Sequence, residues 1–400
     1  MMRALMLKGK LTLLLTILPF TWMVSGQFVF NNGDKILVIL TLISLFTILF
    51  NYGLEPFKKN IKNNNYIYML IILLFISVIY NAIYHSDIIN VRSTSCIILY
   101  FLFIPSDFIT NKILAYSTLI GSICAASFAF WQKNILHLDR AAWQLNAIPY
   151  ATCCLILMIA AIMIGIIYKE KKEILFTSIL SSLISFYALI LCDTRGVLVA
   201  VFVIFLYLLF YVLSTKTSVN IKITIITVLV VITTIGVYST RERLIHDTIQ
   251  GFTQYEQGND ISNTGSRITM WKAGLLLIPQ KPITGFGNNF EPAMTKLYQE
   301  KKIGAQIYNL KLLHFHNQFI DITVKYGVIG LLLLVLFLLF PFYLISQKQY
   351  SKESKLAILL LTLGVVISGL TDVPLEHKQV FVLYVVFIYM FLKKPYQIKA

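Results

Sequence analysis

Two adjacent polar residues stand out as candidates for chemistry. His316 and Asn317 are followed, after nine residues, by Gly327 and then Gly330. They lie where the one long polar segment of an otherwise apolar chain returns to a hydrophobic run. A histidine at such a boundary meets water on one side and lipid on the other, and it can exchange a proton near neutral pH. His316 is therefore our candidate catalytic residue.

His314 precedes His316 by two positions, a spacing that raises the question of a metal site. On a helix, residues two apart point about 200° away from each other and could not share one ion, whereas on a strand they could. No further His or Cys follows at a zinc-like spacing nearby. The sequence therefore predicts no metal and no cofactor. The alternative for His316 is a structural loop histidine held by a backbone carbonyl.

The elements that must position these residues are membrane helices. Of the 400 residues, 58% are hydrophobic, and the mean hydropathy is +0.76. A soluble core of this size cannot accommodate such a composition. We therefore expect an all-α polytopic membrane protein whose surroundings are the lipid bilayer. No nucleotide-binding glycine-rich loop is present, and no nucleic-acid partner is expected.

Apolar runs of roughly the 20 residues needed to cross a bilayer predict about twelve spans. They lie at 9–27, 36–53, 66–84, 93–105, 113–131, 148–168, 174–192, 196–213, 221–238, 325–346, 356–373 and 378–392. The run 93–105 is short, holds two serines and a proline, and could be re-entrant. The chain thus divides into spans one to nine (1–238), one long loop (239–324) and spans ten to twelve (325–400).

The distribution of cations orients these spans, since Lys and Arg near span ends are retained in the cytoplasm. With the N-terminus inside, the segments on its side carry 18 of the 34 cations. The short loops opposite carry six and the long segment carries ten. Both termini are therefore predicted to be cytoplasmic, and the long loop is predicted to face outward.

Arginine and histidine concentrate on the predicted outer side. Six of the seven arginines and all six histidines lie there, whereas the inner side uses lysine. A guanidinium makes paired hydrogen bonds to phosphate or carboxylate, while lysine acts as a point charge. For any single arginine a solvated loop position is an equal alternative. The set as a whole favours a site for a phosphorylated ligand on the outer face.

The long loop carries helical periodicity, so we expect it to be ordered and partly helical. The apolar faces are Ile245, Ile249, Phe252 and Tyr255, then Ile268, Trp271 and Leu275, then Met294, Leu297 and Tyr298. Thr264 or Ser266 is the expected cap of the second helix, and Pro279 its end. Residues 282–287 hold two glycines that allow tight turning and a close approach of the backbone to a ligand.

These residues resemble the bacterial O-antigen ligase family, which shares its membrane fold with O-antigen polymerases. The family pattern of His, then Asn, Ser or Gln, nine residues and Gly-x-x-Gly is matched in full by residues 316–330. Residues 193–196 (Asp-Thr-Arg-Gly), which include Arg195, resemble the family's Ser/Thr-Arg-Gly motif at the outer start of a span.

Two further motifs of this family have counterparts in the long loop. Gly-Ser-Arg at 265–267, with Arg267 and the following Trp271, resembles the second arginine motif. Residues 282–287, with Gly285 and Gly287, resemble the Pro-x-x-Gly-x-Gly turn. The first half of the chain matches in layout only, apart from Arg140, which resembles a less constant loop arginine.

The resemblance implies a GT-C-like glycosyltransferase in the bacterial inner membrane, active on the periplasmic face in lipopolysaccharide biosynthesis. It would transfer polysaccharide from undecaprenyl pyrophosphate-linked O-antigen to a sugar hydroxyl of lipid A-core, without ATP. His316 would be the general base. Arg195 and Arg267, with Arg140 as a third partner, would hold the charge on the departing diphosphate. One attack at the anomeric carbon predicts inversion.

The remaining motif residues receive supporting roles. Asn317 is expected to position His316 or the substrate, and Trp271 to contribute to substrate binding. Gly327 and Gly330 lie one helical turn apart, a spacing that allows close helix packing. Two acids near the motif, Asp321 and Asp372, are expected to act as structural or orienting partners of cations.

Two rival functions have to be weighed. A transporter would also have twelve spans, but it would place ionisable residues at mid-membrane, and these spans are nearly free of them. A polymerase of the same fold uses the same donor and differs only in its acceptor. The sequence alone does not separate ligase from polymerase decisively, although the match at 316–330 favours the ligase.

Overall fold

The computed structural model describes residues 2–30, 32–62, 64–85, 87–214, 247–257 and 262–393, with four isolated positions between 215 and 246. All regular structure in these residues is helical, and the protein is an all-α polytopic membrane protein. Among the residues that the structure describes, seven helices are long and apolar enough to cross a membrane: α2 (Gly33–Tyr52), α4 (Asn65–Tyr84), α6 with its π-helical extension η2 (Asn111–Ile135), α7 (Ala147–Ile167), α8 (Lys172–Cys192), α9 (Arg195–Ser214) and α15 (Gln318–Gln347).

Further helices complete the membrane bundle. They are α1 (Met2–Val24), α5 (Val91–Phe103), α16 (Lys352–Gly369) and α17 (Lys378–Leu392), with the short elements η1 (Gly26–Phe28), α3 (Glu55–Lys62), η3 (Arg140–Ala142) and η6 (Pro374–Glu376). Eleven of the twelve predicted apolar runs are therefore helices, and the run 221–238 lies outside the described residues.

The short run at 93–105 is a helix of 13 residues, α5. At 1.5 Å per residue it is about 20 Å long, less than the hydrocarbon core of a bilayer. Ile97 and Phe101 are fully buried, and α5 packs against α2, α4 and α17. A short helix is compatible with a membrane when neighbouring helices shield its ends from lipid.

The centre of the bundle is α7, which packs against α6, α8, α16 and α17. It carries no charged residue and is apolar around its whole circumference, as expected of a helix that is buried on every side. Cys153 and Cys154 are fully buried free thiols. They pack as small apolar side chains.

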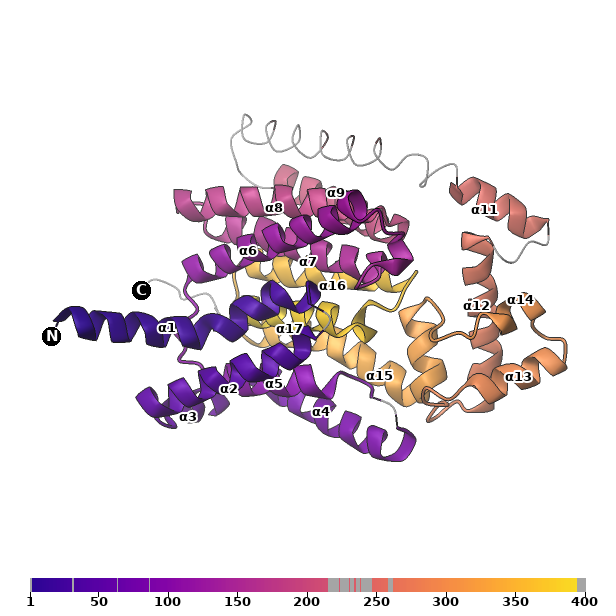
Figure 1. Ribbon diagram of the computed structural model, residues 1–400, viewed down its shortest axis with the longest axis horizontal. Helices are drawn as coiled ribbons and strands as arrows, with labels where there is room; N and C mark the ends of the chain where they lie inside the picture. The colour runs from indigo at the N-terminus through magenta and orange to yellow at the C-terminus, as the bar shows by residue number, and fades with distance from the viewer. Residues whose placement is uncertain are drawn as a thin grey trace.

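The long loop forms a separate layer of helices at the end of the bundle opposite the start of α1 (Figure 1). These are α11 (Asp247–Glu256), α12 (Asn263–Leu277), η5 (Ile278–Gln280), α13 (Glu291–Gln299) and α14 (Ala305–Asn309). Buried apolar side chains from α12, α13 and α14 form a second core, which also includes Phe315 and Val324 of the following segment. Through this core the layer is attached to α15.

The second loop helix differs in detail from its prediction. Its N-cap is Ser262, whose hydroxyl accepts the N–H of Gly265 at 2.9 Å, rather than Thr264 or Ser266. Its buried face is formed by Met270, Ala273 and Leu277, whereas Leu275 is 56% exposed. The predicted buried face was wrong because packing against α13 and α15, and not periodicity alone, determines which side of α12 is covered.

Span ten begins earlier than predicted. Asn317 caps α15 by accepting the N–H groups of Phe319 and Ile320, so the helix starts at Gln318 instead of 325. A break at Gly327, with φ 64° and ψ −163°, separates the first turns of α15 from the apolar remainder. Because these first turns contain polar residues, the hydropathy of the sequence placed the start of the span too late.

Candidate functional site

His316 lies in the loop between α14 and α15, in a backbone conformation that is rare for residues other than glycine. Its φ is 48°, in the left-handed region. The indole N–H of Trp271 donates to the carbonyl oxygen of His316 at 3.2 Å. The N–H of Phe315 donates to Asp321 Oδ1 at 2.9 Å. Strain of this kind persists only where the surroundings fix the backbone, so the loop holds His316 in a set direction.

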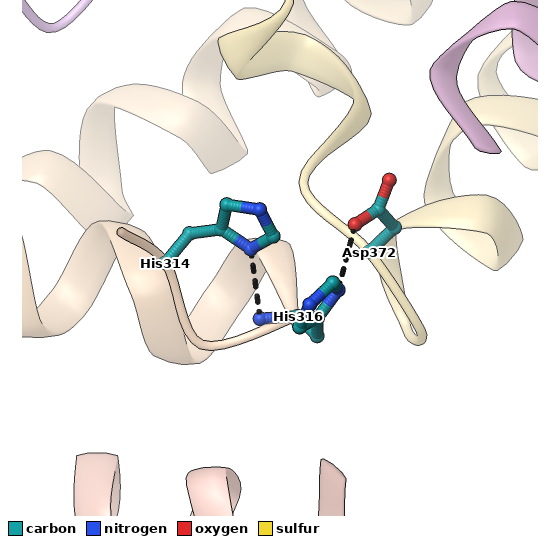
Figure 2. Close-up of side chains that lie close together, drawn as sticks. All are labelled: His314, His316 and Asp372. Carbon is teal, nitrogen blue, oxygen red and sulfur yellow. Dashed lines mark hydrogen bonds and ion pairs between the residues drawn. The ribbon is translucent and has the colours of Figure 1, made fainter. Parts of the chain in front are cut away.

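The ring of His316 contacts the carboxylate of Asp372 (Figure 2). Nδ1 of His316 lies 3.0 Å from Oδ1 of Asp372, which follows α16 and is 3% exposed. Burial opposes ionisation of Asp372, but the hydrogen bond from His316 and the charges of nearby histidines outweigh it, so its pKa is lowered. An ionised Asp372 accepts the Nδ1 proton of His316, which leaves the Nε2 lone pair as a base.

His314 packs edge-on against His316, with ring centroids 4.2 Å apart. Its Nδ1 atom accepts the backbone N–H of His316 at 3.4 Å. Burial, together with the proximity of His316, lowers the pKa of His314 to about 3. The ring of His314 is therefore neutral at physiological pH and supports the loop as a hydrogen-bond acceptor.

His314, His316 and Asp372 are also close enough to be considered as metal ligands, with one ligand atom from each within 4.8 Å of the others. The two histidines lie in a loop, so the helical geometry that would separate them does not apply. A metal would have to displace two hydrogen bonds, one from the backbone to His314 Nδ1 and one between His316 and Asp372. The absence of a metal therefore stays our prediction.

Arg140, Arg195 and Arg267 line one polar cavity of about 350 Å³. They come from η3, α9 and α12, three elements far apart in the sequence. The lining also includes Thr371, the residue directly before Asp372. The cavity therefore lies beside the His316–Asp372 pair.

Two of these arginines are held by contacts to other elements of the chain. Arg140 donates through Nε to the carbonyl oxygen of Cys192 at 2.8 Å. Arg195 donates through Nη1 to the hydroxyl of Thr248 on α11 at 2.9 Å. Each contact fixes the plane of a guanidinium at the cavity wall, as binding a charged ligand requires.

Arg267 is partly buried, as are Arg140 and Arg195. Burial lowers its pKa and repulsion by Arg195 adds to this, while Asp372 acts in the opposite direction. Within the described residues, the guanidinium of Arg267 has no hydrogen-bond acceptor. Two guanidinium groups that repel each other across a cavity, one of them without an acceptor, favour an anionic ligand between them.

The glycine turn, residues 282–287, packs against α15 and does not line the cavity. Four backbone hydrogen bonds join the turn to the residues on either side of the break in α15. They run from Phe286 N–H to Val324 O (2.9 Å), Gly287 N–H to Lys325 O (2.7 Å), Val328 N–H to Pro282 O (2.8 Å) and Ile329 N–H to Ile283 O (3.4 Å). The backbone groups that the break frees are thereby satisfied.

Gly285 and Gly327 make this contact possible. Both have positive φ, 69° and 64°. A Cβ on Gly327 would lie 2.1 Å from the carbonyl oxygen of Ile283, and one on Gly285 would lie 2.4 Å from the carbonyl carbon of Lys325. The close approach expected for this turn is therefore to the backbone of α15. Gly330 has a local role, since a Cβ there would meet Tyr326 of the same helix.

Trp271 and Asn317, predicted to bind substrate or to position His316, have partners within the protein. Besides capping α15, Asn317 donates from Nδ2 to the carbonyl oxygen of Leu370 at 3.1 Å. This bond ties the segment that carries His316 to the segment that carries Asp372. Neither Trp271 nor Asn317 lines the arginine cavity.

Neither the contact of His316 with Asp372 nor the burial of Lys325 was predicted from the sequence. Lys325 is 1% exposed and lies four residues after Asp321, with which it forms an ion pair of 2.9 Å. The sequence feature that could have revealed this pair is an acid and a base four residues apart in the first turns of a membrane span.

Comparisons with known proteins found similarity to O-antigen ligases. The family model described as O-antigen ligase matches residues 180–335, which include Arg195, Arg267 and His316. The protein called O-antigen ligase of Escherichia coli (strain K12) is 24% identical over 310 residues, 75% of this chain and 71% of that relative. An uncharacterised protein of Haemophilus influenzae is 31% identical over 103 residues, 25% of each chain. With its membrane helices and the motifs around His316, the chain is similar to the O-antigen ligase family over residues 180–335.

Proposed function

We propose that this protein is an O-antigen ligase of the bacterial inner membrane. It transfers polysaccharide from undecaprenyl pyrophosphate to a sugar hydroxyl of lipid A-core, on the periplasmic face and without metal or ATP. The observation that carries the proposal is the arginine cavity beside the His316–Asp372 pair. A cation-lined cavity adjoining a histidine base is the arrangement that displacement of a diphosphate requires.

The donor's diphosphate occupies the cavity lined by Arg140, Arg195 and Arg267. As the bond between the anomeric carbon and the diphosphate oxygen breaks, negative charge grows on the leaving group. Paired N–H donors fixed at the cavity wall stabilise that charge more than they stabilise the intact donor, so they lower the barrier.

The acceptor hydroxyl attacks the same anomeric carbon from the opposite face, and His316 Nε2 takes its proton. One glycosidic bond forms, one carbon–oxygen bond to diphosphate breaks, and undecaprenyl diphosphate leaves. The imidazolium that results lies against the ionised carboxylate of Asp372, which stabilises it. A single displacement inverts the anomeric configuration.

A deletion strain separates the proposed ligase from a polymerase, the alternative with the same fold. Without a ligase, lipid A-core is expected to lack attached O-polysaccharide of any length, while long polymer accumulates on the undecaprenyl carrier. Without a polymerase, the core would instead carry a single repeat unit. A lipopolysaccharide gel distinguishes the two results, and core bearing one repeat would overturn the ligase assignment.

Transfer by the purified protein is expected to survive EDTA. Nδ1 of His314 accepts a backbone N–H and Nδ1 of His316 is bonded to Asp372, so a metal would have to displace both hydrogen bonds. The measurement is the rate of transfer in liposomes before and after dialysis against the chelator. Loss of activity that a divalent ion restores would show that these residues hold a metal.

A further inference from the structure

A lysine is buried close to the site without contacting the arginine cavity. Lys325, in the first turns of α15, is 1% exposed, and its Nζ atom lies 2.9 Å from Asp321 Oδ2 and 2.5 Å from Glu376 Oε1. Removing such a charge from water is costly, and ion pairs offset the cost only in part. Ionisable groups in membrane segments are uncommon for this reason, so their presence calls for a function.

One arm of this network reaches the loop that carries His316. Asp321 uses one carboxylate oxygen for Lys325 and the other, Oδ1, to accept the N–H of Phe315 at 2.9 Å. Phe315 is the residue directly before His316, and its side chain is fully buried. Asp321 thus connects the ammonium group of Lys325 to the backbone directly before His316.

The other arm reaches the loop that carries Asp372. Glu376 belongs to η6, four residues after Asp372, and its side chain is 40% exposed. The adjacent N–H of Leu375 donates to Gln318 Oε1 at 2.9 Å. The two loops are therefore joined on one side by the His316–Asp372 contact and on the other by Lys325 and Gln318.

Lys325 itself is placed by the glycine turn. Its carbonyl oxygen accepts the N–H of Gly287 at 2.7 Å, immediately before the break at Gly327. Lys325 therefore contacts the glycine turn of the loop layer and lies in the first turns of α15. Through Asp321 and Glu376 it is also linked to the two loops that carry His316 and Asp372. A displacement of any of these parts would alter the contact between His316 and Asp372.

We propose that Lys325 is a positioning residue, which acts through Asp321 and Glu376 to keep the imidazole of His316 against the carboxylate of Asp372. It touches neither the donor nor the acceptor. The inference rests on the proposed function, because it assigns to Lys325 the alignment of the base that this function requires.

The test is a double-mutant cycle between Lys325→Met and Asp372→Asn, measured as kcat and KM for the lipid-linked donor. Lys325→Met alone should lower kcat on the order of 10–100-fold, the cost of a small misplacement of reacting groups, with donor KM nearly unchanged. In the Asp372→Asn background, the same change should have little further effect, because the contact that it aligns is already lost. Lys325→Arg should restore most of the activity.

Lys378→Met is the matched control. Lys378, the first residue of α17, makes an ion pair of 2.5 Å with Asp34 of α2, and this pair includes neither Asp321, Glu376 nor Asp372. It should leave kcat close to the unmodified value. If Lys325→Met does not accumulate in membranes, Glu376→Gln provides the same cycle, since it leaves the pair of Lys325 and Asp321 intact.

The outcomes separate this inference from the function on which it rests. If Asp372→Asn retains a low but measurable kcat and Lys325→Met lowers kcat by the same factor in both backgrounds, Lys325 acts independently of the His316–Asp372 contact and the positioning role is wrong. If Asp372→Asn and His316→Ala both keep full activity, His316 is not the base and there is no contact for Lys325 to align. If the unmodified protein transfers no glycan from the lipid-linked donor, the proposed function itself fails.

Discussion

His316→Ala is expected to abolish glycan transfer while the protein still inserts into the membrane. Removing a general base lowers rates by roughly 10²–10⁴-fold. Asp372→Asn should also cause a large loss, because an amide cannot stabilise the imidazolium that forms on His316. The measurement is transfer from a lipid-linked donor by purified protein in liposomes, at matched protein amounts.

The control for this prediction is His314→Ala. The neutral ring of His314 accepts a backbone N–H and supports the loop, so its loss should be much milder than that of His316. Equal losses in the two variants would mean that both histidines act together, as metal ligands would. Normal transfer by His316→Ala would remove His316 from the mechanism.

Arg267→Lys and Arg195→Lys are each expected to lose most activity although the charge is kept. A lysine presents one ammonium where the guanidinium presents a planar fork, so paired hydrogen bonds to phosphate oxygens are lost. The expected loss is on the order of 10²-fold in kcat, as for removal of one donor to a developing anion. Arg267 should be the more sensitive, because its guanidinium has no acceptor among the described residues that would keep it in place.

Two substitutions away from the cavity serve as controls. Arg92→Lys changes the same residue type at a partly exposed ion pair with Asp34. Lys302→Ala removes a half-exposed pair with Glu300 on the outer layer. Both should be nearly neutral, since Arg92→Lys keeps the charge beside Asp34 and the half-exposed pair of Lys302 contributes little. Full activity in both Arg195→Lys and Arg267→Lys would exclude a diphosphate held by guanidinium forks.

The pairing of site residues follows from contacts between distant parts of the chain. Arg140, Arg195 and Arg267 meet in one cavity because η3, α9 and α12 are brought to the same end of the bundle. Asp372 meets His316 across 56 positions of sequence. No local pattern contains such information, because it depends on which helices pack side by side.

The sequence by itself determined the membrane class, the helices at eleven of the twelve apolar runs and the presence of helices in the long loop. These properties are sums over neighbouring residues, such as the hydropathy of a run and the period of its apolar side chains. The motif at 316–330 likewise predicted His316 as the catalytic residue from local residues alone.

Only the tertiary structure decided the partner of His316, the break in α15 and the buried position of Lys325. The glycine turn illustrates the reason: the absence of a Cβ at Gly285 and Gly327 is visible in the sequence, but not the backbone that each glycine approaches. Close approach and burial of a charge depend on the partner that the fold supplies, and that partner is fixed only when all the helices have packed.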